Sequence, residues 1–337
     1  MICPHCEKSL LRKERPNNVC SNCKRRYALD PKTNPLQISD LRIRRVMTKL
    51  TDEGRVPCTP GQLWYALSRK SLRSKRTESG CVALFVAVVA TIVGLFSDTR
   101  FVVIAGCVVL LGAITYLGML AGGLRRGRPR VARSDFHKDV LQQWIGVYGS
   151  PPPGLVDDRR HPQPGPIPAG SHHAVLLCPD PSIAAFLVAA GLPDRYGLAL
   201  AREVHDVPAR GPVIVLHDAG AHGLLLLQRA RGALPGRPVI DAGLPLRTMR
   251  GLPNAVPYRS GKPGRAAMAE LTARGHFTRG ELRWLRAGWT FPLIGAPPAR
   301  LLAVVERIAE RVGMATDPQR RHAAAVGFLT WPTTGER

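Results

Sequence analysis

The chain has 337 residues and a formal net charge of +24 at pH 7, with 48 Lys and Arg against 24 Asp and Glu. This excess favours polyanionic partners, either nucleic acid or an anionic lipid surface, without choosing between them. Arg, Ala, Gly and Pro are abundant, as in proteins from high-GC bacterial genes, so composition alone can account for part of the charge. Four of the eight cysteines form two close pairs and four are scattered. This pattern excludes a disulfide framework and fits a reducing compartment.

Residues 1–36 are predicted to form a zinc ribbon. Cys3 and Cys6 make one C-x-x-C knuckle, and Cys20 and Cys23 make a second, with thirteen residues between the knuckles. Two such knuckles place four thiolates around one Zn²⁺, and so short a segment cannot fold without that crosslink. The metal is therefore expected to be structural, with His5 a bystander. Small ribbons often serve only for docking, so contact with nucleic acid through the basic run 24–26 stays an open alternative.

Residues 37–77 are predicted to be helical. Leu41, Val46 and Leu50 recur at helical spacing, a glycine interrupts the pattern, and the Thr-Pro-Gly sequence at 59–61 opens a second helix.

The middle of the chain holds two uncharged apolar runs, 79–97 and 101–124, of 19 and 24 residues. About 20 apolar residues cross a bilayer as a helix, so the runs predict a transmembrane hairpin over 79–124. Basic clusters flank both outer ends, and the positive-inside rule then puts both termini in the cytoplasm, as in a two-span protein of the cell membrane. The lipid bilayer is thus an expected partner. The alternative is a buried helical hairpin in a soluble core.

The segment 125–171 is expected to hold a short juxtamembrane helix followed by a linker rich in Pro and Gly, and residues 316–337 a tail. Residues 172–315 alternate strand and helix and end in a helical extension. Strands are predicted at 174–178, 197–201, 213–217 and 238–241, and helices at 182–190 and 223–231. This alternation predicts a Rossmann-like α/β domain, with a parallel sheet and helices on its faces.

One predicted strand ends in the most suggestive local sequence of the chain. Asp218, Gly220 and Gly223 form a D-x-G-x-x-G run leading into a helix, with His222 just before the last glycine. The run resembles the D-x-D-x-x-G strand end of Toprim domains, found in primases, type IA and II topoisomerases and the topoisomerase VI A subunit. It is most similar to the nuclease subunit of Wadjet plasmid-defence systems, where a His-Gly pair follows the acids. The resemblance implies a Toprim-like domain in which an upstream Glu and two Asp residues bind Mg²⁺ for phosphodiester chemistry.

The match departs from that pattern at two of the three metal ligands. Gly220 stands where the second Asp belongs, and Pro179 stands where the upstream Glu belongs. The carboxylates left at the sheet edge are Asp218 and Asp180, and one or two carboxylates plus substrate phosphate can hold Mg²⁺. We therefore expect a degenerate domain that does not cleave, with an active Mg²⁺ site as the alternative.

A second resemblance lies in the predicted helical segment 37–77. The sequence from Thr59 to Tyr65 is similar to the T-x-R-[DE]-L-[YF]-Y segment of the topoisomerase VI A winged helix, whose final tyrosine attacks DNA. Tyr65 takes that position, but Gly61 replaces the Arg and Gln62 replaces the acid. The resemblance implies a winged-helix-like segment with Tyr65 as a candidate nucleophile. The alternative is that Tyr65 simply packs on a helix.

These observations leave three functions. The favoured one is a membrane-anchored protein whose zinc ribbon and degenerate Toprim-like domain bind nucleic acid near the membrane without cutting it. The second is a membrane-anchored scaffold or sensor that binds protein partners. The third is a metal-dependent DNA nuclease using Asp218 and Asp180, with Tyr65 as nucleophile. Only the third requires enzymatic activity.

Overall fold

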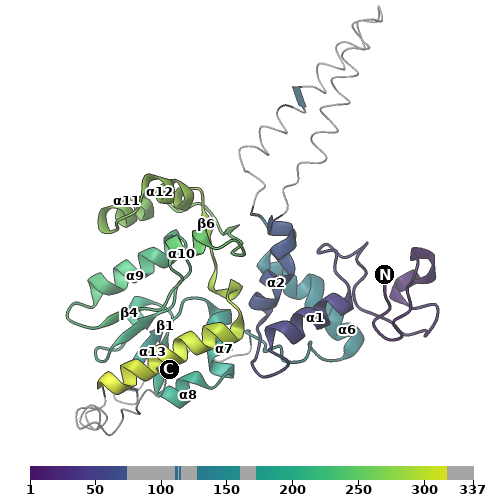
Figure 1. Cartoon of the computed structure of the whole chain (residues 1–337), viewed down its shortest axis with the longest axis horizontal. Coiled ribbons are helices and arrows are strands. Elements are labelled where there is room, and N and C mark those ends of the chain that lie inside the picture. The colour runs from purple at the N-terminus through teal and green to yellow at the C-terminus, as the bar shows by residue number, and fades with distance from the viewer. Residues whose placement is uncertain (74–110, 113, 115–126, 160–171, 317–337) are drawn as a thin grey trace, which may run out of the picture.

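The computed structural model describes residues 1–73, 111, 112, 114, 127–159 and 172–316 (Figure 1). The cysteine-rich N-terminal region (residues 1–36, called the ribbon below) lies at one end of the molecule, an α/β domain lies at the other, and a group of helices lies between them.

The α/β domain is built on a four-stranded parallel sheet in the order β2-β1-β3-β4. The strands are β1 (Ala174–Leu177), β2 (Leu198–Ala201), β3 (Val213–Val215) and β4 (Val239–Asp241). Strand β1 pairs with β2 on one side and with β3 on the other. These strands confirm the parallel α/β domain expected from the alternating pattern of residues 172–315.

Helices cover both faces of the sheet. Side chains on one face join the main core under α7 (Pro181–Ala189), α8 (Leu192–Tyr196) and α13 (Pro298–Thr316), and those on the other pack against α9 (Ala221–Ala233). Alternate residues of β1 point to opposite faces, as the pleat of a strand requires: Leu176 belongs to the first core and Leu177 to the second. The domain is therefore a three-layer sandwich with a buried sheet.

The helical group consists of α1 (Asp40–Leu50), α2 (Pro60–Arg73) and a continuous helical stretch formed by α5 (Arg133–Phe136), a π turn (His137–Leu141) and α6 (Gln142–Tyr148). Helix α2 is buried on nearly all sides because it packs against α1 and α5 on one side and against α7 and the turn Leu293–Gly295 of the α/β domain on the other. Its Trp64 donates to the carbonyl of Val131 at 2.9 Å. The helical group and the α/β domain consequently share one hydrophobic core.

The remaining elements surround the carboxyl end of the sheet or precede α1. They are short turns at Arg12–Glu14, Pro16–Asn18 and Val204–Asp206, helices α10 (Leu246–Gly251), α11 (Arg265–Arg274) and α12 (Arg279–Arg286), and the antiparallel pair β5 (Tyr258–Arg259) and β6 (Trp289–Thr290). Thr278 caps α12 in a capping box with Glu281.

The membrane-spanning architecture and the two-span membrane localisation require correction. In the described residues no helix is both long and apolar enough to cross a bilayer. The longest described helix, α13, has 19 residues but carries charges along its length, and α2 has 14, fewer than the about 20 needed. The predicted hairpin over 79–124 lies outside the described residues, apart from residues 111, 112 and 114. The membrane anchor and the assignment of both termini to the cytoplasm therefore have no support in the described residues.

Two smaller expectations are also modified. Within residues 37–73 the structure describes two helices and one isolated bridge, from Cys58 to Leu155, but no strand pair that would form a wing. That bridge shows that the first part of the Pro/Gly-rich segment packs onto the helical group: Cys58 donates its N–H to Gly154, and Val156 donates to Cys58.

Candidate functional site

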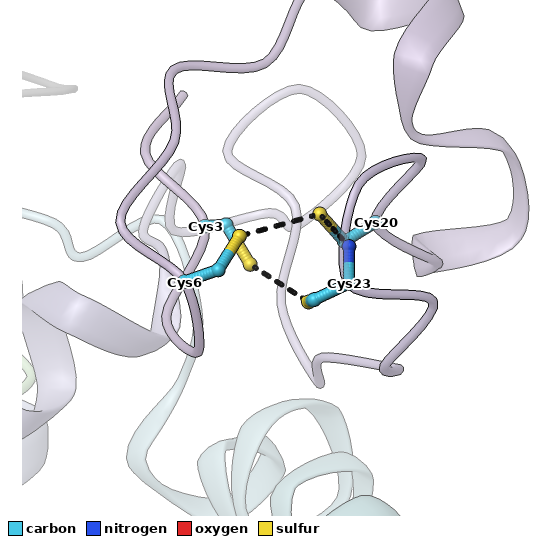
Figure 2. Close-up of side chains that lie close together, drawn as sticks. All are labelled: Cys3, Cys6, Cys20 and Cys23. Atoms are coloured by element: carbon cyan, nitrogen blue, oxygen red, sulfur yellow. Dashed lines mark hydrogen bonds between the residues drawn. The ribbon is translucent and has the colours of Figure 1, made fainter.

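The clearest candidate site is the cluster of four cysteines near the N-terminus (Figure 2). The sulfur atoms of Cys3, Cys6, Cys20 and Cys23 all lie within 4.8 Å of one another. The Sγ atoms of Cys3 and Cys23, and those of Cys6 and Cys20, are 3.8 Å apart. A tetrahedral site with metal–sulfur bonds of about 2.3 Å has edges of about 3.8 Å, so the cluster fits a tetrahedral metal ion.

The two knuckles adopt the same backbone conformation. The residue after each second cysteine, Glu7 or Lys24, has a positive φ near 60° and donates its N–H to the carbonyl of the first cysteine. Backbone N–H groups also point at the sulfur atoms: His5 donates to Cys3 at 3.4 Å and Cys23 donates to Cys20 at 3.5 Å. Such donors stabilise thiolates and orient them toward a metal.

The thiols differ in their protonation equilibria. A backbone hydrogen bond from Lys8 lowers the pKa of Cys6 to about 6, and one from Cys23 lowers the pKa of Cys20. Burial raises the pKa of Cys3 to about 12. His5 is not part of the cluster, because its Nε2 donates to the carbonyl of Arg26 at 2.8 Å, in line with its expected role as a bystander.

The ribbon docks on the helical group through Asp40, the first residue of α1. The buried Asp40 carboxylate accepts hydrogen bonds from the N–H groups of Ala28 and Leu29, both at 2.8 Å, and from the Tyr148 hydroxyl at 2.5 Å. Arg44 donates to the carbonyl of Pro4 and stacks over the Tyr148 ring. Residues 1–36 are thus fixed to the rest of the protein.

A second candidate site is a cavity of about 900 Å³ at the carboxyl edge of the sheet. Both sequence-predicted acids, Asp180 after β1 and Asp218 after β3, line it, together with His222 at the start of α9. Strands β1 and β3 are neighbours, and the chain leaves them toward helices on opposite faces. This is the switch point where open α/β sheets bind ligands.

The carboxylate of Asp180 accepts hydrogen bonds from several groups of the protein. It accepts two hydrogen bonds of 2.8 Å from the two Nη atoms of Arg133. It also caps α7 by accepting from the N–H groups of Ser182 and Ile183. The Arg133 guanidinium therefore neutralises the carboxylate at the place where a cation would be expected to bind.

Asp218 is largely buried. Its carboxylate accepts a 2.7 Å hydrogen bond from the N–H of Leu293. Burial raises the pKa of Asp218 to about 6, and the nearby charge of Asp180 adds to the effect, which the Leu293 hydrogen bond partly opposes. Asp180 and Asp218 thus face one cavity, but in the described residues only the four cysteines form a group of three or more potential ligands close enough to share a metal ion.

Close packing explains why glycine stands at two positions where the resembled patterns have polar residues. A Cβ at Gly220 would lie 2.4 Å from Oγ1 and 2.7 Å from Cβ of the buried Thr290. A Cβ at Gly61 would lie 2.7 Å from Oγ of Ser182 and 3.0 Å from the Arg133 guanidinium. The acid and the arginine of those patterns would therefore clash with neighbours in this fold.

Tyr65 lies in the core. Its side chain is 5% exposed, and its hydroxyl donates to the carbonyl of Val256 at 2.5 Å. Burial raises its pKa to about 12. A buried phenol that is bonded to a backbone carbonyl is poorly placed for attack on DNA.

Two side chains that bond to acids at this edge, Arg133 and His217, were not predicted from the sequence. Arg133 lies 47 residues from Asp180 and has no local signal. His217 is 1% exposed; its Nδ1 donates to the carbonyl of Asp218 at 2.9 Å and its Nε2 lies 3.0 Å from Oδ1 of Asp241.

Comparison with known proteins gives no relative: no family model matches the chain, and neither a curated protein nor a solved structure is significantly similar to it.

Proposed function

We propose that this protein binds nucleic acid through its basic N-terminal part, residues 1–73, and that its Toprim-like α/β domain does not cleave phosphodiesters. The four cysteines would hold a structural Zn²⁺. The observation that carries the proposal is the uncompensated positive charge of residues 1–73.

Residues 1–73 contain sixteen Lys and Arg against six Asp and Glu. Four of these acids already have partners within the protein: Asp30 pairs with the buried Arg15, Asp40 accepts three hydrogen bonds, Asp52 pairs with Arg55 at the surface, and Glu14 accepts the N–H of Leu11. The basic run 24–26 is exposed on the ribbon. Such a surface supports sequence-independent contacts to phosphates.

Two observations support the absence of cleavage. The Arg133–Asp180 pair removes one of the two carboxylates that could hold Mg²⁺, and Thr290 leaves no room for an acid at position 220. That leaves Asp218 as the one unpaired carboxylate of the two, and because one of its oxygens already accepts a backbone N–H, it offers few of the oxygen ligands that Mg²⁺ requires.

Zinc is the metal that best fits four sulfur ligands in tetrahedral geometry. With no open coordination position, such an ion would hold the two knuckles together and would take no part in chemistry.

The test is binding of the full-length chain to a fluorescent 20-base-pair DNA and to single-stranded DNA and RNA between 50 and 300 mM KCl. The slope of log K against log salt should be steep, because each phosphate contact to duplex DNA contributes about −0.9. The variant Arg25→Ala/Arg26→Ala should weaken binding and reduce that slope. Its control, Arg195→Ala/Arg229→Ala, removes the same charge from residues of the α/β domain that are already paired with Glu306 and Glu270, and should change neither.

Equal loss in both variants, or no binding at 50 mM KCl, would contradict the proposal and favour the protein-binding scaffold. Cleavage with Mg²⁺ or Mn²⁺ that disappears in Asp218→Ala would instead establish the nuclease alternative.

A further inference from the structure

A second, smaller cavity of about 400 Å³ lies in the helical group, away from the sheet edge. Three segments distant in sequence line it: the stretch leading into α1, one face of α2, and the residue just before Val131. The lining residues are Pro31, Leu36, Gln37, Ile38, Ser39, Arg42, Leu67, Lys70, Ser71 and Arg130. We call it the basic pocket.

The charged side chains of the basic pocket are all cations. Arg42, Lys70 and Arg130 line it, and no carboxylate does. None of the three forms an ion pair with an acid in the part of the chain that the structure describes. The nearest acid in sequence, Asp40, turns away to bind the ribbon backbone and Tyr148. Three cations without acidic partners around one cavity create a positive potential there, and a bound anion would offset their mutual repulsion.

The rest of the wall suits a compact, polar anion. The buried side chains of Leu36, Ile38 and Leu67 form the apolar part of the lining, and a lining of low polarity strengthens the charge interactions beside it. The hydroxyl of Ser39 provides a neutral donor, because it makes no capping hydrogen bond to α1, whereas that of Ser71 already donates to the carbonyl of Ser68 at 2.8 Å. Arg guanidinium groups match the oxygen geometry of phosphate, and Lys adds a point charge.

We propose that the basic pocket binds a phosphomonoester, and that its ligand is the terminal phosphate of a nucleic-acid strand. A terminal phosphate carries about 1.5 to 2 negative charges at pH 7, against one for a backbone phosphodiester, and therefore gains more from three cations. A concave pocket also admits a chain end more readily than the middle of a strand. This inference deepens the proposed nucleic-acid binding and rests on it, since residues outside the pocket would hold the remainder of the strand.

The experiment compares three fluorescent 12-nucleotide DNA strands with the full-length protein at 150 mM KCl: one with a 5′-phosphate, one with a 3′-phosphate and one with hydroxyls at both ends. At least one phosphorylated strand should bind about tenfold more tightly than the hydroxyl strand, as expected for two or more charge-assisted hydrogen bonds. The variant Arg42→Ala/Lys70→Ala should bind all three strands equally. The control Arg45→Ala/Lys49→Ala removes two exposed cations of α1 that do not line the pocket and should keep the preference.

Thymidine 5′-monophosphate separates the pocket from the strand-binding surface. It should raise the melting temperature of the wild-type protein and of the control, but not that of Arg42→Ala/Lys70→Ala. If the wild type binds the three strands equally, or if Arg42→Ala/Lys70→Ala keeps the preference, the pocket proposal is wrong while nucleic-acid binding stands. If no strand binds but the mononucleotide still stabilises the wild type through these residues, the pocket takes a free phosphomonoester and the strand-end ligand is wrong, together with the proposed function.

Discussion

Arg133 and Asp180 face each other in a bidentate pair, with each Nη donating to a different carboxylate oxygen at 2.8 Å. The pair joins the start of α5 in the helical group to the start of α7 in the α/β domain. It therefore ties two parts of the molecule together while it neutralises an acid at the sheet edge. A structural role of this kind predicts a measurable coupling in stability.

We expect Arg133→Ala to lower the free energy of unfolding by about 2 kcal/mol, because it leaves a carboxylate that is only 16% exposed without its counter-charge. Asp180→Asn should cost less, since an amide oxygen can still cap α7. A double-mutant cycle in urea should give a coupling of about 1 to 2 kcal/mol. The more exposed pair Arg195–Glu306 is the control, with an expected coupling below about 1 kcal/mol. Equal couplings for the two pairs would contradict the structural role of Arg133.

Asp218 should make stability depend on pH. Its pKa is about 6 in the folded protein and near its usual value of 3.8 in the unfolded chain. Between these values the folded state keeps the proton and the unfolded state loses it, so wild-type stability falls as the pH rises. Above pH 6 the full penalty, on the order of 3 kcal/mol, is present.

Asp218→Asn keeps the acceptor for the Leu293 N–H and removes this penalty. It should therefore stabilise the protein above pH 6 and have no effect at pH 4. Asp241→Asn should do the opposite, because the hydrogen bond from His217 lowers the pKa of Asp241 and its charge stabilises the fold above its usual pKa. Melting temperatures from pH 4 to pH 8 test both signs, and a pH-independent effect of Asp218→Asn would refute the assignment.

The periodic parts of the sequence predicted much of this fold. Alternating apolar and helical patterns located the four strands, and C-x-x-C spacing located the metal cluster, because both depend on neighbours in the chain. The partners of the two acids could not be found in this way: Leu293 lies 75 residues from Asp218, and Arg133 lies 47 from Asp180. The membrane anchor was inferred from hydropathy alone, and no described helix supports it. The basic pocket could not be predicted from the sequence, because its lining residues come from three distant segments.

A substitution at Gly220 tests whether steric contact with Thr290 prevents an acid at this position of the Toprim-like pattern. Gly220→Asp would restore the second acid but drive its Cβ into Thr290, so we expect a loss of about 1 to 3 kcal/mol in stability. Gly264 offers a matched control, because it is also the N-cap residue of a helix, α11, and has open space around it. Gly264→Asp should be neutral or stabilising, since Asp is a favoured N-cap residue. Equal melting temperatures for the two variants would contradict the steric account.

Tyr65→Phe separates a packing role from a nucleophilic one. Loss of the hydrogen bond to Val256 should cost about 1 kcal/mol and leave nucleic-acid binding unchanged, because the hydroxyl is buried. A covalent protein–DNA adduct in the wild type that is absent from Tyr65→Phe would show that the tyrosine reacts after all.

Loss of the metal ion should weaken the packing of residues 1–36 against the start of α1. The purified protein is expected to hold one zinc per chain, and Cys3→Ser/Cys20→Ser should hold none, because two of four ligands are removed. Cys58→Ala/Cys178→Ala is the control: both thiols are buried in the core and far from the cluster in sequence, so its zinc content should stay at one. Without metal, the N–H groups of Ala28 and Leu29 would no longer be held against Asp40, and the start of α1 would exchange its amide protons faster. Metal analysis combined with hydrogen exchange tests whether docking of the ribbon depends on the ion. Loss of zinc with unchanged amide protection of α1 would mean that the ribbon folds and docks without its ion.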